Sequence, residues 1–349
     1  MRTLIKVISL VLIVSFALVA ISCNTDTESE TLTSDTLGDE ITEKNTNKST
    51  KKNNKKEEAT SRPIKQTEPP TTLENTDGLD LNLKILTQNV RYADDPNGNS
   101  VKERTTRFGA LLEEYSPDIV GTQEVTYEWY QYLKTLDKYE LVGSSKSGQE
   151  DENGDWNLIM YDAERFVLMD SETFWLSATP EIVSKIDGPS VIRICTWAEL
   201  FDRYTGETII MVNTHIDHTN TNYRVQQLHH LFAHLNDKLA ERYDECRIYM
   251  TGDFNAVEDS RPHMLMENFE FVDSRSVARE DKSTVNVTCH EYFEGEEQWV
   301  FDYCFFKGED TVLSYEIISK NYAGEMDTEP GFVSDHYGVI AVFERKGNS

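Results

Sequence analysis

Acids, amides and histidines follow directly after apolar runs at several places in the sequence. In RIYMTGDFN, Asp253 and Asn255 come right after an apolar run, and His215 and Asp217 do the same in ETIIMVNTHIDH. Four further segments share the pattern, and their polar residues are Asn89, Glu124, Asp302, Asp335 and His336. A single Asp or Asn there is ordinary turn chemistry, but six segments of one chemistry predict that these side chains meet in one site.

The residue types indicate which ligand such a site would take. Strand ends along one rim of a sheet are where α/β folds gather their functional groups. Carboxylates and amides are hard oxygen ligands, and together with histidines they favour Mg²⁺ or Mn²⁺ over zinc. No Cys stands among these residues. The sequence therefore predicts a rim that binds a hard divalent cation.

The elements that would position these residues can be read from hydrophobic periodicity. Residues 101–115 and 222–242 repeat apolar side chains at helical spacing, and both segments are amphipathic. The apolar runs that carry the candidate residues, and segments such as NLIMYD and RFVLMDSETFWL, read as strands separated by turns. Many strands mixed with a few helices predict an α/β sandwich.

The N-terminal part of the chain has the character of an export signal and a tether. Arg2 and Lys6 precede an apolar run, Val7–Ile21, that is shorter than the ~20 residues of a spanning helix. The run ends in AISC, and this resembles a lipoprotein box in which Cys23 is acylated, with Ala20 where Leu is more usual. A simple cleaved signal or a short anchor is the alternative.

We therefore expect three parts in the chain. They are a lipoprotein signal peptide (1–22), a disordered polar tether (23–80) and a globular domain (81–349). The tether is mostly Thr, Ser, Asn, Lys, Glu and Asp, which cannot bury enough apolar surface to offset the entropy of ordering. The expected location is outside the cytoplasm, on the cell membrane through the N-terminal lipid.

Charge argues against a long nucleic-acid groove. The net charge of the chain is −28. Ten of its 34 basic and thirteen of its 62 acidic residues lie in 1–80, which leaves 24 basic and 49 acidic residues in the domain. A field of this sign repels polyanions, so nucleic acid is a permitted but not a favoured partner. The domain has four cysteines, and both disulfide pairing and buried free thiols are open.

Six short motifs in order give the chain a family resemblance. They are QN (88–89), TQE (122–124), NTHIDH (213–218), GDFN (252–255), FDY (301–303) and SDH (334–336). Together they resemble the endonuclease/exonuclease/phosphatase superfamily over nearly all of 83–345. SETFWLSATP and RICTWAEL further resemble a bacterial lipoprotein branch that is similar to the deadenylase-like nucleases and to pancreatic deoxyribonuclease. The resemblance implies a four-layer α/β sandwich of two packed mixed sheets flanked by helices.

The resemblance also implies roles for the motif residues in metal-assisted hydrolysis of a phosphate ester by water. Metal binding falls to Glu124, Asn89 and Asp335. Asp253 and Asn255 match the pair that orients the water and the scissile phosphate. His336 matches the catalytic histidine, Asp302 the carboxylate that holds it, and His215 a second histidine near the phosphate.

Three further residues have weaker assignments. Asp155 occupies the place of an acid that orients His215, although an ordinary turn Asp is equally consistent. Arg193 stands where related enzymes carry a phosphate-contacting arginine, with a surface ion pair as the alternative. Arg224 follows a proposed site residue closely and is a second candidate for binding phosphate.

These observations favour an exported, membrane-tethered, Mg²⁺-dependent phosphoesterase that acts as a monomer. Its substrate is open among nucleic acids, nucleotides, phospholipid head groups and sugar phosphates, so an extracellular nuclease is one alternative. A non-catalytic binding lipoprotein on the same fold is another, although the complete set of motif residues argues against it. A zinc peptidase is disfavoured because the chain has no H-E-x-x-H.

Overall fold

The strands of this protein alternate between two cores, and this alternation builds the sandwich. The computed structural model describes residues 70–73, 75–149, 154–188, 190–292, 299–325 and 327–345. Ile85 lies in the core between the two sheets, whereas its neighbour Leu86 packs towards the helices of the first sheet. Met211 and Val212 divide in the same way between the central core and the helices of the second sheet. Successive strand residues point to opposite faces, so both sheets are covered on both sides.

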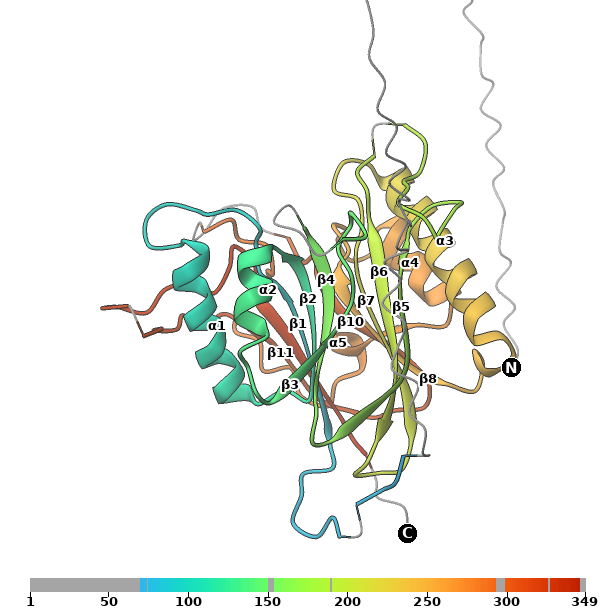
Figure 1. Ribbon diagram of the computed structural model, residues 1–349, viewed down its shortest axis with the longest axis horizontal. Helices are drawn as coiled ribbons and strands as arrows, with labels where there is room; N and C mark the ends of the chain where they lie inside the picture. Colours follow the sequence, from blue (N-terminus) through green and yellow to red (C-terminus); the bar gives the residue numbers. More distant parts are fainter. Residues whose placement is uncertain are drawn as a thin grey trace, which may run out of the picture. The chain divides into compact units, whose positions relative to one another are not determined.

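Within the described residues each sheet has six strands, and the predicted fold class is confirmed (Figure 1). The first sheet has the order β11-β12-β1-β2-β4-β3, and the second has the order β5-β6-β7-β8-β10-β9. The strands of the first sheet are β1 (Leu83–Asn89), β2 (Ile119–Val125), β3 (Tyr139–Val142), β4 (Trp156–Asp162), β11 (Val312–Ile318) and β12 (Gly338–Phe343). Those of the second are β5 (Phe166–Trp175), β6 (Ile194–Asp202), β7 (Thr208–His215), β8 (Arg247–Asp253), β9 (Val272–Asp273) and β10 (Asp302–Lys307).

Each sheet is mixed and contains a parallel pair at its centre. β1 runs parallel to β2, and β7 runs parallel to β8. The carboxyl ends of parallel neighbours meet at the same edge of a sheet, and ligands bind there in α/β folds. Consequently the ends of β1, β2, β7 and β8 converge on one rim of the sandwich, at the top of Figure 1.

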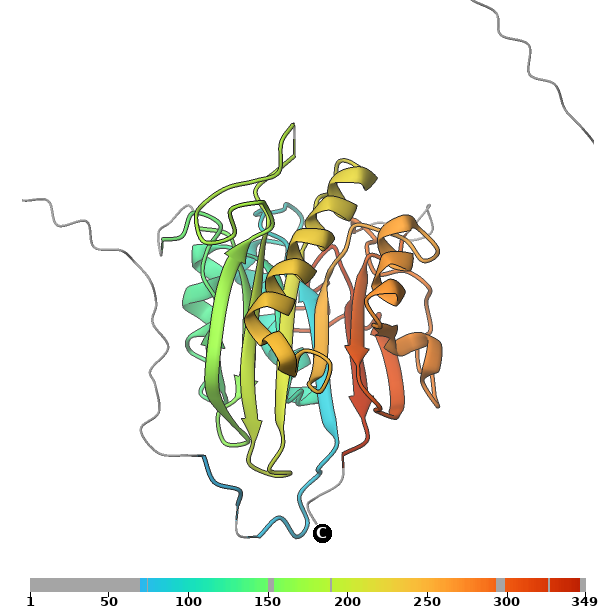
Figure 2. The same ribbon diagram turned by 90° about the vertical axis from the view of Figure 1, so that its right-hand side faces the viewer.

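Helices form the outer layers. α1 (Val101–Tyr115) and α2 (Tyr127–Leu133) cover the first sheet, and α3 (Thr221–Leu239) and α4 (Arg261–Asn268) cover the second. Figure 2 shows α3, in gold, lying across the strands of the second sheet. A 3₁₀ turn (Ala240–Arg242) follows α3, and the short α5 (Ser274–Val277) follows β9.

Helix α1 has the predicted bounds for a clear reason. Ser100 and Glu103 form a capping box, and Ser116 ends the helix in a left-handed conformation. The predicted 222–242 segment corresponds to α3, which Asn220 caps at its start. The short helices α2, α4 and α5 were not predicted, because one or two turns carry little periodic signal.

The chain reaches β1 at the end of the sandwich opposite the rim. The amide of Leu73 donates to the carbonyl of Arg203 at 2.9 Å, and Arg165 donates to the carbonyls of Leu81 and Asn82, each at 2.8 Å. Arg165 is fully buried and also pairs with Asp202 at 2.8 Å. This segment is the blue part of the ribbon at the lower end of Figure 1.

The predicted signal peptide, Cys23 and most of the predicted tether lie outside the described residues. Among the helices that are described, none combines the length and the apolar character needed to cross a membrane. The four cysteines of the domain are free thiols, and Cys195, Cys289 and Cys304 are buried. This settles the choice between pairing and buried thiols in favour of thiols.

Candidate active site

Strand register brings the predicted residues together from both sheets. Asn89 ends β1 and Glu124 lies near the end of β2, in the first sheet. In the second sheet, Asp253 at the end of β8 is in register with His215 on β7 and with Asp302 on β10. The candidate site is therefore divided between two sheets, and its geometry depends on how the sheets are held together.

Buried amides join the two sheets directly beneath the site. Gln123 Nε2 on β2 donates to Asn213 Oδ1 on β7 at 2.7 Å, and Asn213 Nδ2 donates to the carbonyl of Thr122 at 2.8 Å. Thr251 Oγ1 donates to the same Asn213 oxygen at 3.1 Å. A Cβ on Gly121 would come within 2.0 Å of Thr251 Oγ1, so only glycine permits this approach.

We name Gln123, Asn213 and Thr251 the amide clasp. None of the three received a role from the sequence, although each is a polar side chain inside an apolar strand and all are buried. Polar groups so deep are costly unless they are hydrogen-bonded, and here the bonds run between sheets. A polar residue in the middle of a buried strand was the signal that could have found them.

One amide holds two carboxylates together above the clasp. Asn89 Nδ2 donates to Glu124 Oε1 at 3.2 Å and to Asp253 Oδ2 at 3.0 Å. The backbone amide of Tyr92 donates to the other Glu124 oxygen at 2.9 Å. Glu124 has a left-handed φ of 60°, at a register shift between β2 and β4. Such backbone strain concentrates at functional sites.

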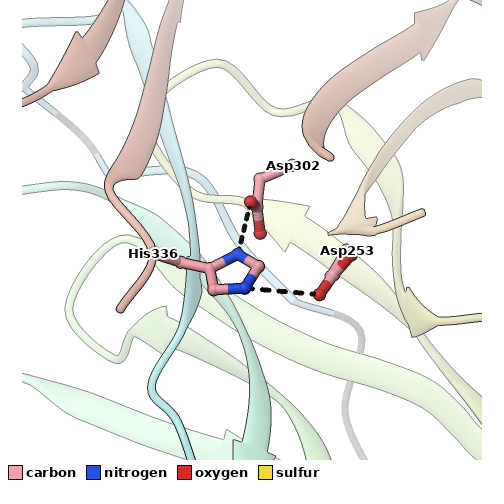
Figure 3. Close-up of side chains that lie close together, drawn as sticks. All are labelled: Asp253, Asp302 and His336. Carbon is pink, nitrogen blue, oxygen red and sulfur yellow. Dashed lines mark hydrogen bonds and ion pairs between the residues drawn. The ribbon is translucent and has the colours of Figure 1, made fainter. Parts of the chain in front are cut away.

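A histidine and an aspartate form the second group of the site (Figure 3). His336 Nδ1 lies 2.7 Å from Asp302 Oδ2, and His336 Nε2 lies 4.0 Å from Asp253 Oδ2. Burial alone would lower the pKa of His336, but the Asp302 carboxylate outweighs it and holds the pKa well above its usual range. Hence His336 carries a positive charge at neutral pH and directs it towards Asp253.

The charge states of the neighbouring groups differ. Burial, and then the negative charge of Asp302, raise the pKa of Asp253 to about 7. Burial, followed by the nearby guanidinium of Arg193, lowers the pKa of His215 well below its usual range. His215 is therefore neutral, and its Nε2 lies 3.0 Å from Asn255 Nδ2. Titratable groups whose environments push their pKa values apart define acid and base roles.

The donor set fits a hard divalent cation. Oxygen atoms of Asp253 and Asp302 and a nitrogen of His336 lie within 4.8 Å of one another. Asp302 keeps His336 protonated, however, so a metal on all three would have to displace the proton on His336 Nε2. Glu124 and Asp253, which share the Asn89 amide, are free of such a conflict. Burial and then the neighbouring Asp302 carboxylate raise the pKa of Asp253, and a cation would stabilise its ionised form.

Asp335 and Arg91 form the outer edge of this cluster. Arg91 Nε lies 3.4 Å from Asp335 Oδ2 and 3.2 Å from Asp95 Oδ2. The hydroxyl of Ser334 donates to the other Asp335 oxygen at 3.1 Å. Asp335 thus adjoins the site beside His336, and in this structure its charge is balanced by a guanidinium.

The three weaker assignments find other surroundings. Asp155 forms an ion pair with Lys146, and within the described residues it makes no hydrogen bond to His215, whose Nδ1 is unpartnered. Asp155 therefore does not orient His215 in this structure. Its carboxylate is held by Lys146, a residue that received no role from the sequence.

The two predicted phosphate-binding arginines differ from each other. Arg193 is buried, and its Nη2 lies 3.3 Å from His218 Nδ1, while its Nε has no hydrogen-bond partner in the described part of the chain. Arg224 Nη1 donates to the carbonyls of Asp217 and His218 at 3.1 and 3.2 Å. Arg193 retains free donors near the site, whereas Arg224 ties down the loop before α3.

Comparison with known proteins identifies the family. The family model described as "Endonuclease/Exonuclease/phosphatase family" matches residues 86–336. The match covers all six motifs and every strand of the two sheets except β12 and the start of β1, and the chain therefore belongs to the endonuclease/exonuclease/phosphatase family. No curated protein matches this chain.

Solved structures share the fold. A mannosyl-6-phosphatase from Bacteroides thetaiotaomicron is 21% identical, covering 75% of this chain and 100% of that chain, with a TM-score of 0.68. An endonuclease/exonuclease/phosphatase from Bacteroides vulgatus is 27% identical over 76% and 100% of the two chains, with a TM-score of 0.66. D. rerio TDP2 complexed with a single-strand DNA product is 18% identical over 76% and 100%, with a TM-score of 0.57.

The Asp302–His336 bond generates a test of coupling. Asp302→Asn and His336→Ala should each lower the rate of ester hydrolysis roughly 10²-fold or more, and the double variant should lose little beyond the worse single one, because the pair acts as a unit. Asp302→Asn should also lower the pKa of His336, measured by NMR titration. Additive losses, or an unmoved His336 titration, would show that Asp302 has only a structural role.

Proposed function

We propose that this protein is a metal-dependent phosphoesterase that hydrolyses phosphodiester or phosphomonoester bonds by in-line attack of water. One observation carries the proposal, namely that the complete set of acids, amides and histidines meets at a single rim of the sandwich. Family membership supports the reaction class. A non-catalytic binding protein would have no need to keep every one of these groups.

The residues of the chain have distinct tasks in this reaction. Asp253 can accept the proton of the attacking water on the carboxylate oxygen that does not face the metal; its pKa of about 7 belongs to the site without a cation, and a bound metal would lower it. Asn255 lies in a left-handed turn fixed by the bond from its own backbone to Asp253, and the amide hydrogen that faces His215 Nε2 in this structure would turn to a phosphoryl oxygen. His336, kept charged by Asp302, stabilises the negative charge that develops on the phosphoryl group.

Glu124 and Asp253 would hold the metal, Mg²⁺ or Mn²⁺, with Asn89 fixing both carboxylates and Asp335 adjoining them. The metal would supply Lewis-acid polarisation of the phosphoryl oxygens. Oxygen ligands without cysteine support a hard cation. His215, held neutral by its surroundings, accepts from Asn255 Nδ2 at its Nε2, so its proton lies on Nδ1, an uncharged donor that has no hydrogen-bond partner in the described part of the chain.

Metal dependence is tested by changing Glu124. Glu124→Gln should fold normally and lose activity by at least about 100-fold, because removing a charged metal ligand costs no less than removing a residue that only orients one. Hydrolysis of bis-p-nitrophenyl phosphate is measured with Mg²⁺ and with EDTA. Glu128→Gln, the same change at an exposed position of α2, is the matched control and should keep wild-type activity. Full activity of Glu124→Gln in EDTA would rule out the metal mechanism.

Charge directs the choice of substrate within this class. Long nucleic acids bind largely through Lys and Arg contacts to successive phosphates, and the domain has 24 basic against 49 acidic residues. One buried arginine near the site, Arg193, suits one or two phosphates better than a long backbone. Among the structural neighbours, one is named for a sugar phosphate and another was solved with a DNA product. We favour the small ester, with the nuclease as the alternative.

The substrate preference is tested by comparing kcat/KM at near-physiological salt with Mg²⁺. A small phosphodiester, a sugar phosphate or a short single-stranded end should be cleaved more efficiently than long duplex DNA, because the domain's field repels a long polyanion. The 81–349 domain is the material for this panel. A preference for long duplex DNA that weakens steeply with salt would instead favour the nuclease.

Export and lipid anchoring are a separate part of the proposal. Support comes from the sequence alone, through the run Val7–Ile21, the AISC segment and the polar stretch that follows. Cys23→Ala should release the protein from the membrane or leave it unprocessed, as read from membrane fractionation and the mass of the mature chain. Cys246→Ala is the control and should remain bound. Unchanged mass and membrane binding in Cys23→Ala would refute the anchor.

A further inference from the structure

Helix α1 places a buried arginine under the loop that borders the carboxylates. Arg104 is 0% exposed, and within the described residues it forms no ion pair with a carboxylate. Its guanidinium donates to four backbone carbonyls, those of Val90, Arg91, Ala93 and Asn99, the last at 2.8 Å. Burying a charge without a counter-ion costs free energy unless its donors are hydrogen-bonded. The donors of Arg104 are satisfied by carbonyls of the loop 90–99, so its burial depends on the path of that loop.

One of these bonds acts on the peptide group that contacts Glu124. Arg104 Nη1 donates to the carbonyl of Arg91 at 3.1 Å. The amide in the same peptide plane is that of Tyr92, and it donates to Glu124 Oε2 at 2.9 Å. In a trans peptide the C=O and the N–H point in opposite directions, and none of the peptide bonds in the described segments is cis. The plane is therefore held between a guanidinium on one side and a carboxylate on the other.

The backbone at this position needs support. Arg91 has a φ of 62°, in the left-handed region that disfavours residues with a Cβ. Tyr92 is 57% exposed, so its side chain does not anchor the loop in the core. The carbonyls of Val90 and Ala93, on either side of the held peptide, also accept from Arg104. The Arg104 guanidinium thus holds the backbone conformation of Arg91 and Tyr92.

We propose that Arg104 is a positioning residue for metal binding, which acts by fixing the Arg91–Tyr92 peptide so that its amide orients Glu124. This inference rests on the proposed function, since it assumes that Glu124 holds the metal. A donor chain from guanidinium to peptide to carboxylate also polarises each bond in turn. Removing a residue that orients a metal ligand in this way typically changes metal affinity or activity by about 10- to 100-fold.

The structure offers a matched control at the other end of the sandwich. Arg165 is equally buried and also donates to backbone carbonyls, those of Leu81 and Asn82, but it lies away from the rim. Replacing either arginine by lysine keeps the charge and removes the forked donors. Both substitutions should lower the thermal midpoint, whereas only the change at Arg104 should alter the response to metal.

The experiment measures Mg²⁺ binding through the Mg²⁺-dependent rise of the thermal midpoint, together with hydrolysis of bis-p-nitrophenyl phosphate. In Arg104→Lys the Mg²⁺ concentration for half the effect should rise about 10- to 100-fold in both measurements. In Arg165→Lys it should match the wild type. An Arg104→Lys variant with the wild-type Mg²⁺ requirement would overturn the assignment and leave the proposed function intact.

Two further outcomes are decisive. A wild-type protein whose stability and activity ignore Mg²⁺ would overturn the proposed function, and the assignment of Arg104 with it. If Arg104→Lys does not fold, amide exchange of Tyr92 is measured by NMR in the wild type and in Glu124→Gln. If the Arg91–Tyr92 peptide is fixed as proposed, the Tyr92 amide should be protected in the wild type. It should exchange at least about tenfold faster in Glu124→Gln, because its hydrogen bond to a charged carboxylate is lost. A Tyr92 amide that is unprotected in the wild type would overturn the assignment.

Discussion

The distance between the two sheets is the constraint on which the site depends. Glu124 and Asn89 belong to one sheet, and Asp253, His215 and Asp302 belong to the other. Apolar packing alone would allow the sheets to slide, because dispersion contacts have little directionality. The hydrogen bond from Gln123 to Asn213 has a preferred length and direction, and it crosses from one sheet to the other just below these groups. The same contact therefore serves both stability and catalysis.

The electrostatics of the site follow from this forced approach. Asp253 and Asp302 face each other across neighbouring strands and cannot both ionise freely in a buried setting. His336 removes part of the conflict by taking a charge next to Asp302, and His215 stays neutral beside Arg193. The two histidines of one small site therefore differ in charge, His336 being positive beside Asp302 and His215 neutral beside Arg193, although both have the same ordinary pKa.

The sequence predicted the fold class, helix 101–115 and the group of residues on the rim, because periodicity, caps and strand-end residues are local signals. The sequence could not predict the order of the strands in the sheets or the pairing of Asp155 with Lys146, because both depend on contacts between distant segments. Arg104 shows the same limit. In an amphipathic helix an arginine reads as a solvent-facing residue, and only the path of the loop 90–99 explains why it is buried.

The way the chain joins the sandwich has a consequence for access. Leu73 and the segment before β1 lie at the end where the strand begins, and the seven residues of β1 put about 23 Å between that end and Asn89. A fusion partner or an affinity support joined directly at residue 70 would therefore lie at the end of the sandwich away from Asn89. A preparation held at that residue should leave the rim open to substrate and product.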